Sequence, residues 1–239
     1  MSSHTASDSI TSPTGSGHSP TASAPGLVRG AGVAAQAVAG TYVIGFLAMA
    51  VYLVPRGFAS PVGEPSASLD FLIDHQTELA AWYFVLYLLG GVAMAVVSLG
   101  VGERLRAAPA LAQVSAALGL IWSGLLMASG SLALVGQHAV VELHAQDPDL
   151  ALNTWVSTSV VQDALGGGIE VAGALWAAVV GYTAIRTRAL SPALGGLAVG
   201  LGAVGMATVV PAAADAATSI FGLGFIVWFT WLGFTLGRR

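Results

Sequence analysis

Six apolar segments, each long enough to cross a lipid bilayer as a helix, dominate the chain. They cover about residues 33–54, 79–101, 110–136, 155–182, 193–212 and 219–236. About 20 helical residues cross a hydrocarbon core of about 30 Å. Each segment must be a helix, because a helix satisfies its own backbone hydrogen bonds in lipid, and the period-two alternation of a membrane barrel is absent. The sequence therefore predicts an all-α integral membrane protein, a bundle of six transmembrane helices.

The composition agrees with a lipid-covered surface. Only 8% of the 239 residues are charged, whereas about a quarter of the residues in a soluble domain are charged. The formal charge of −4 and the scattered basic residues argue against a nucleic-acid partner. The chain has no cysteine and no lysine, which excludes disulfides, thiolate metal sites and lysine-linked cofactors. The lipid bilayer is the expected partner.

The chain divides into a tail and a membrane domain. Residues 1–28 consist mainly of Ser, Thr, Pro, Gly and Ala, and such a segment cannot bury enough apolar surface to offset its ordering entropy. We predict a disordered tail over 1–28 and a transmembrane domain over 29–239. The tail is not a secretory signal, because it lacks a basic n-region and the apolar run that follows it is too long.

The arginines predict how the bundle is oriented. Six spans place seven of them on one side of the membrane and only Arg56 on the other; the seven are Arg29, Arg104, Arg106, Arg186, Arg188, Arg238 and Arg239. The positive-inside rule then places both termini in the cytoplasm. The Ala- and Gly-rich, lysine-free composition suggests a GC-rich bacterial genome, so we expect a multipass protein of the bacterial inner (plasma) membrane.

The fourth segment contains "VVQDALGGGIEVAGALW", residues 160–176, in which acidic residues and glycines interrupt an apolar run. In a continuous helix Asp163, Gly167 and Glu170 share one face. A carboxylate at the bilayer centre costs about 2.5–3.5 kcal/mol, so this face is predicted to point into the bundle. The glycines allow close helix approach but each weakens the helix by roughly 1 kcal/mol. The predicted buried polar seam comprises Gln162, Asp163, Gly166, Gly167, Gly168 and Glu170.

Two interpretations of this seam stay open. In the first, Glu170 binds a small ligand or carries a proton, as intramembrane acids often do. In the second, the seam is a structural clamp that bonds Ser123, Gln113, Thr208 or a neighbouring backbone group. The favoured function is non-enzymatic: the seam braces the bundle or binds a small ligand or proton. A proton-coupled small-molecule transporter that uses Glu170 is the alternative.

A second group of candidates lies in the predicted outer loops and comprises His75, His138, Glu142 and His144. His138 and Glu142 are four residues apart and share a helical face. Histidine and carboxylate sets can hold Zn or Cu, so a divalent metal site or metalloenzyme at the outer face is a further alternative. The competing interpretation is a solvated acidic rim, since two histidines four apart with a glutamate between them are absent.

Glycine motifs indicate packing, not cofactor binding. Gly200, Gly202 and Gly205 spell G-x-G-x-x-G, but inside an apolar span with no preceding strand they do not predict a dinucleotide site. Two G-x-x-x-G pairs, Gly196 with Gly200 and Gly233 with Gly237, predict close packing within the bundle or in a homo-oligomer. No nucleophile–base pair is evident, so no catalytic residue is assigned.

Three strings, "GLIWSGLLMASG", "VQDALGGGIEVAGALW" and "FGLGFIVWFTWLG", resemble a family of small bacterial six-span membrane proteins of unknown function. The family pattern in the fourth segment is Q-D-G-L-G-G-G-N-E. The chain matches it at Gln162, Asp163, Leu165, Gly166, Gly167, Gly168 and Glu170, and departs from it at Ala164 and Ile169. The resemblance covers the second to sixth segments. It implies the six-span fold and singles out the fourth segment, and it implies no activity, substrate or cofactor.

Overall fold

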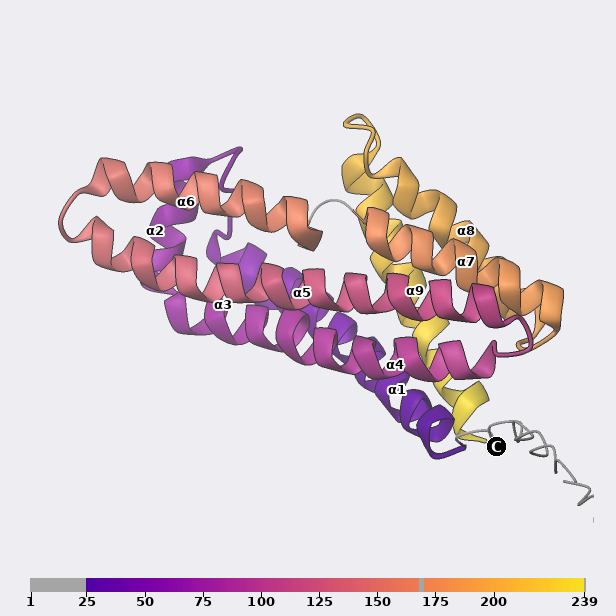
Figure 1. Ribbon diagram of the computed structural model, residues 1–239. Coiled ribbons are helices and arrows are strands. Elements are labelled where there is room, and N and C mark those ends of the chain that lie inside the picture. Colours follow the sequence, from indigo (N-terminus) through magenta and orange to yellow (C-terminus); the bar gives the residue numbers. More distant parts are fainter. Residues whose placement is uncertain (1–24, 168–169, 239) are drawn as a thin grey trace, which may run out of the picture.

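The computed structural model describes residues 25–167 and 170–238, which form helices joined by short turns and include no strand (Figure 1). The elements are α1 (Pro25–Leu47), η1 (Ala48–Leu53), η2 (Val54–Arg56), α2 (Pro65–Asp74), α3 (Gln76–Tyr83), η3 (Phe84–Leu89), α4 (Gly90–Arg104), α5 (Pro109–His144), α6 (Pro148–Gln162), η4 (Asp163–Gly167), α7 (Val171–Thr187), α8 (Pro192–Ala207) and α9 (Ala214–Gly237). The η segments are π- or 3-10-helical turns that continue a neighbouring α-helix.

Five helical stretches of the described chain are long and apolar enough to cross a membrane: Pro25–Arg56, Gln76–Arg104, Pro109–His144, Pro148–Thr187 and Ala214–Gly237. A sixth apolar helix, α8, is shorter. These helices lie at the six predicted segments. Large apolar side chains point outward from them, with Val33, Val51 and Val135 at least 70% exposed. An all-helical bundle with such a surface fits a lipid environment better than water.

The first helix begins earlier than predicted. Its start at Pro25 falls inside the tail predicted over 1–28, so that boundary is wrong; residues 1–24 lie outside the described part of the chain. Small residues farther along let α1 pack tightly on α9 and α4. A Cβ on Gly32 would lie 2.9 Å from the Gly237 nitrogen, and one on Gly100 would overlap Ala31.

The longest helix, α5, organises the rest of the molecule. Its 36 residues extend about 54 Å at 1.5 Å per residue, eight residues beyond the predicted end at 136. Figure 1 shows α7, α8 and α9 gathered beside the half of α5 that begins at Pro109, and α6 and α2 beside the half that ends at His144. Helix α1 packs against both α4 and α9. The break between α6 and α7 therefore lies beside the middle of α5.

An aromatic core joins α5, α7 and α9. Its six members are at most 2% exposed; they are Trp122, Trp176, Phe221, Phe225, Trp228 and Phe229. Neighbouring rings lie 4.6–6.5 Å apart in tilted, stacked and edge-on arrangements, and aromatic pairs of this kind contribute about 0.5–1.5 kcal/mol beyond their buried area. The indole N–H of Trp228 donates to the Leu194 carbonyl over 3.0 Å and so attaches α8 to the same core.

Glycines bring several helices into close contact, as predicted for one of the two G-x-x-x-G pairs. A Cβ on Gly233 would overlap Gln36 of α1, and the Gly237 nitrogen lies 2.9 Å from where a Cβ on Gly32 of α1 would be, so close packing of this pair within the bundle is confirmed. Gly196 and Gly200 have no neighbour within 4 Å, so within the bundle that prediction is wrong. The contact between α7 and α8 uses Gly195, the residue before Gly196. Its carbonyl oxygen lies 2.5 Å from where a Cβ on Gly181 would be.

Candidate functional site

The fourth apolar stretch is broken in its middle. Regular α-helix ends at Gln162, a short π-helical segment follows, and α7 starts at Val171. Gly166 has φ 146° and ψ 19°, a left-handed backbone conformation that interrupts the helix. The prediction of one continuous helix over 155–182 is therefore wrong, and so is the prediction that Asp163, Gly167 and Glu170 share a face.

Backbone conformation, not close packing, explains the glycine at position 166. A Cβ there would have one heavy-atom neighbour within 4 Å, the Leu126 Cδ2 at 3.9 Å, which is an ordinary van der Waals contact. Glycine adopts a positive φ without the steric cost that other residues incur. The expected role of Gly166 in helix approach is thus corrected. Gly168 and Ile169, also in or beside the predicted seam, lie outside the described residues.

A reciprocal pair of hydrogen bonds fixes the end of α6 on α5. The side-chain amide of Gln162 donates to the Ser129 hydroxyl over 3.0 Å, and that hydroxyl donates to the Gln162 backbone carbonyl over 3.1 Å. Both residues are buried. The last backbone carbonyl groups of a helix have no hydrogen-bond donor within the helix. The Ser129 hydroxyl supplies a donor to the Gln162 carbonyl, and the pair of bonds fixes the end of α6 beside α5.

A second contact fixes the start of α7. The backbone N–H of Glu170 donates to the Thr208 hydroxyl over 3.0 Å, and Thr208 donates to the Gly205 carbonyl over 2.7 Å. Thr208 was one of the predicted clamp partners, but the group it binds is the backbone and not the carboxylate. Of the other predicted partners, Ser123 donates to the Gly91 carbonyl and Gln113 is exposed.

The two carboxylates of the predicted seam have separate environments. Asp163 is exposed, so the expectation that it is buried in the bundle is wrong, whereas Glu170 is half-buried. Glu170 lies within electrostatic range of Tyr42 and Tyr87. Asp163 lies within range of Tyr83 and Tyr87. The break thus separates the two acids, and of the two only Glu170 lines a cavity with Tyr42 and Tyr87.

Glu170 borders a cavity of about 180 Å³. The walls come from α1 and η1, from α3 and η3, from α5, from the break and from α9; the lining residues are Tyr42, Gly45, Phe46, Met49, Trp82, Leu86, Tyr87, Leu126, Gly166, Glu170, Thr218 and Gly222. Apart from Gly166 and Glu170, none of these was a predicted site residue. They belong to segments far apart in the sequence, and no local pattern indicates that they meet.

The cavity wall is aromatic and largely apolar. Trp82 is held by a hydrogen bond from its indole N–H to the Gly45 carbonyl over 3.1 Å. Its ring lies 6.5 Å from that of Tyr87 and 4.9 Å from that of Tyr83. Glu170 is the one ionisable carboxyl group among the lining residues, and none of them is basic. A pocket of apolar walls with a single charged group is the common form of a small-molecule site.

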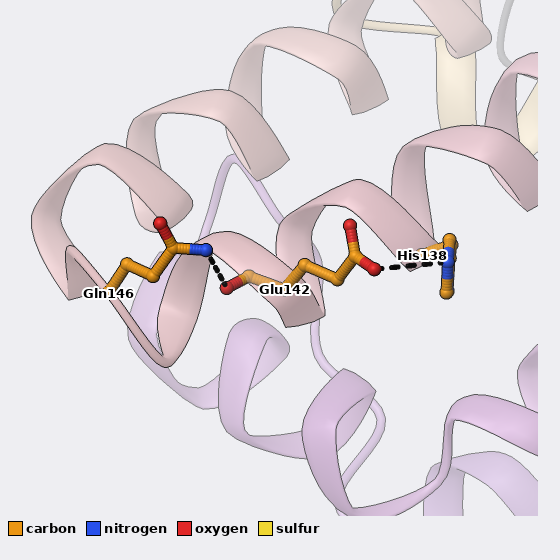
Figure 2. Close-up of polar contacts among 3 residues, drawn as sticks. All are labelled: His138, Glu142 and Gln146. Atoms are coloured by element: carbon orange, nitrogen blue, oxygen red, sulfur yellow. Dashed lines mark hydrogen bonds and ion pairs between the residues drawn. The ribbon is translucent and has the colours of Figure 1, made fainter.

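The histidines of the outer candidate set do not assemble into a site. Figure 2 shows His138 and Glu142 on the exposed face of α5, with the His138 Nε2 3.4 Å from the Glu142 Oε1, and Gln146 bonded to the Glu142 carbonyl. The His75 ring stacks on Phe71 at 4.4 Å, and His144 lies in the last turn of α5. Within residues 25–167 and 170–238, no group of three or more His, Asp or Glu side chains is placed to hold a metal ion.

Comparison with known proteins adds no relative: no family model, no curated protein and no solved structure matches the chain. The resemblance of the fourth segment to a bacterial membrane family therefore stays a prediction. The functional interpretation depends on the geometry of the break, the cavity and Glu170.

Proposed function

We propose that the chain is a non-enzymatic multipass membrane protein that binds a small molecule in the cavity beside Glu170. The cavity is the observation that carries this proposal. Its volume of about 180 Å³ exceeds the roughly 150 Å³ of an engineered apolar cavity that binds benzene. The other predicted role of the seam was to brace the bundle. The Gln162 side chain and the Glu170 backbone make the bracing contacts, so the Glu170 carboxylate is available to a ligand.

We further propose six crossings, with both termini in the cytoplasm of a bacterium. Helix α8 has 16 residues, about 24 Å, which is slightly short for a hydrocarbon layer of about 30 Å. Two arginine-bearing turns, at 105–108 and 188–191, and the arginine-bearing ends of α1 and α9 lie toward the same end of the molecule in Figure 1. Points on the same side of a membrane are separated by an even number of crossings. Because α9 is long enough to cross between the 188–191 turn and the C-terminal end, this distribution supports a crossing by α8 as well.

The break itself supports a binding role. The 17 residues of α7 separate Glu170 from the 188–191 turn by about 25 Å, which is still within the thickness of a hydrocarbon layer. Non-helical backbone at such depth is tolerated where it is buried in protein or lines a cavity. Gly166 and Glu170 both line the cavity, so the irregular backbone lies where a ligand could use it.

The binding proposal is tested with 4-fluorobenzyl alcohol, a neutral probe of one aromatic ring, and fluorine NMR of the protein in phosphatidylcholine nanodiscs. We expect saturable binding to the wild type above the partitioning into empty nanodiscs. Met49→Trp fills the cavity and is expected to remove this binding. Val51→Trp is the matched control, because Val51 is 70% exposed and does not line the cavity. This variant is expected to keep the binding. Equal signals from the two variants would overturn the proposal.

Proton-coupled transport is the second candidate, and the discontinuous helix favours it. Many transporters place their substrate or ion site at the interrupted part of a transmembrane helix. Glu170 would carry the proton, and the Tyr42 and Tyr87 side chains line the same cavity. The test uses proteoliposomes with trapped pyranine and a potassium potential set by valinomycin. Proton movement through Glu170 predicts faster proton uptake with wild type than with Glu170→Gln, and identical rates would contradict a role of Glu170 as a proton carrier under this potential.

A further inference from the structure

We infer that the cavity selects a small cationic ligand, a protonated amine attached to a single apolar ring or a chain of similar size. This inference rests on the proposed function, because it names the chemical class of ligand for the same cavity. Three properties of the wall lead to it: the charge of Glu170, the aromatic rings around that charge and the size of the space.

Among the described residues, the Glu170 carboxylate has no hydrogen-bond or ion-pair partner. None of the lining residues is basic, and no described residue donates a hydrogen bond to the carboxylate. The hydrogen bond that Glu170 makes to Thr208 uses its backbone N–H instead. A partly buried charge is costly unless it is paired and hydrogen-bonded. An ammonium group on the ligand would supply both the opposite charge and the hydrogen-bond donors.

The aromatic rings favour the same sign of charge. Tyr42, Trp82 and Tyr87 line the cavity, and the face of an aromatic ring attracts a cation. The indole N–H of Trp82 is already bonded to the Gly45 carbonyl, so that ring offers the ligand its π surface and not a donor. An anion would meet both the carboxylate and the negative ring faces, which disfavours it.

The helix ends at the break do not reverse this preference. The start of α7 carries roughly half a positive charge and the end of α6 roughly half a negative charge. Both ends meet at the break, so their fields partly cancel, and the Glu170 carboxylate, when ionised, is the dominant charge. The volume limits the ligand as well, since about 180 Å³ accommodates a benzene-sized body with a short polar group.

The test compares three probes that share one ring: 4-fluorobenzylamine, 4-fluorobenzyl alcohol and 4-fluorobenzoate. Each is titrated against wild-type protein in phosphatidylcholine nanodiscs and followed by fluorine NMR, with empty nanodiscs as the reference. We expect the amine to bind at least about tenfold more tightly than the alcohol, because one hydrogen bond to a charged group changes an affinity by at least about tenfold. We expect the benzoate to bind more weakly than the alcohol.

Glu170→Gln, which removes the charge and keeps the shape, is expected to lower the affinity for the amine to that for the alcohol. The matched control is Glu78→Gln, a carboxylate that bonds Tyr52 and does not line the cavity; this variant is expected to keep the tenfold preference. If Glu170→Gln does not fold, Glu170→Asp keeps the charge and must keep a preference for the amine.

The outcomes separate this inference from the function on which it rests. Equal affinities of the wild type for amine and alcohol would overturn the inference and leave the cavity as a binding site. Persistence of the amine preference in Glu170→Gln would also overturn it. Failure of all three probes to bind would overturn the proposed function itself.

Discussion

The backbone N–H of Glu170 donates to the Thr208 hydroxyl over 3.0 Å, so the residue that precedes α7 is tied to the residue that follows α8. Thr208 is 3% exposed. Thr208→Val keeps the shape of the side chain but leaves the N–H without its acceptor. We expect this variant to lower the free energy of unfolding by roughly 1–3 kcal/mol, the cost of a buried unsatisfied group.

The measurement is reversible unfolding in mixed detergent and SDS micelles. Thr235→Val is the matched control, because the Thr235 hydroxyl is exposed and bonds only the Trp231 carbonyl of its own helix. We expect a change of under about 0.5 kcal/mol for this control, as for most surface substitutions. A Thr208→Val change as small as that of the control would show that the contact does not stabilise the break.

A second prediction concerns the backbone at Gly166, whose φ of 146° is unfavourable for residues with a Cβ. Gly166→Ala is expected to destabilise the protein by roughly 1–3 kcal/mol, the usual cost of a strained backbone conformation. Gly196→Ala is the comparison, because Gly196 is helical and has no neighbour within 4 Å. There alanine is expected to stabilise the helix by up to about 1 kcal/mol. Effects of the same sign in thermal unfolding would contradict the assigned break.

The third prediction is an energetic coupling across the α5–α6 contact. Ser129 and Gln162 exchange two hydrogen bonds, so Ser129→Ala and Gln162→Leu are expected to be non-additive, with a coupling of roughly 0.5–3 kcal/mol in a double-mutant cycle. The control cycle combines Ser129→Ala with Thr235→Val, which share no partner, and is expected to be additive. Additivity in both cycles would mean that the two hydrogen bonds contribute nothing to holding α6 on α5.

The fourth prediction concerns the number of crossings. Because the chain has no cysteine, single exposed positions can be replaced by cysteine and labelled with an impermeant maleimide in intact cells. Six crossings predict labelling of Ser60→Cys, Gln146→Cys and Ala212→Cys from outside, and protection of Ala107→Cys and Ser191→Cys until the membrane is opened. Ala212 and Ser191 lie at opposite ends of α8. Identical labelling of these two positions would show that α8 does not cross.

Apolar length predicted where the helices lie, because crossing a lipid layer demands about 20 apolar residues whatever the tertiary structure. Helix ends were predicted less well. Helix α1 starts at Pro25, among Ser, Ala, Pro and Gly residues that apolar length does not mark.

The break illustrates a different limit. The cost of three consecutive glycines was recognisable in the sequence, but whether a helix tolerates that cost depends on what else satisfies its backbone groups. Ser129 and Thr208 do so, from 33 and 38 residues away. The cavity was unpredictable for the same reason, because Tyr42, Trp82 and Thr218 meet only after the helices have packed.

The central claim is that the carboxylate of Glu170 faces a cavity that a small molecule can enter. Its most direct test is modification by diisopropylcarbodiimide, a small apolar reagent for carboxyl groups, with the modified residue located by mass spectrometry of the wild type, Met49→Trp and Val51→Trp in nanodiscs. We expect an adduct on Glu170 in the wild type and in Val51→Trp, and a large decrease in Met49→Trp. An unmodified Glu170 in the wild type, or equal modification in the two tryptophan variants, would contradict it.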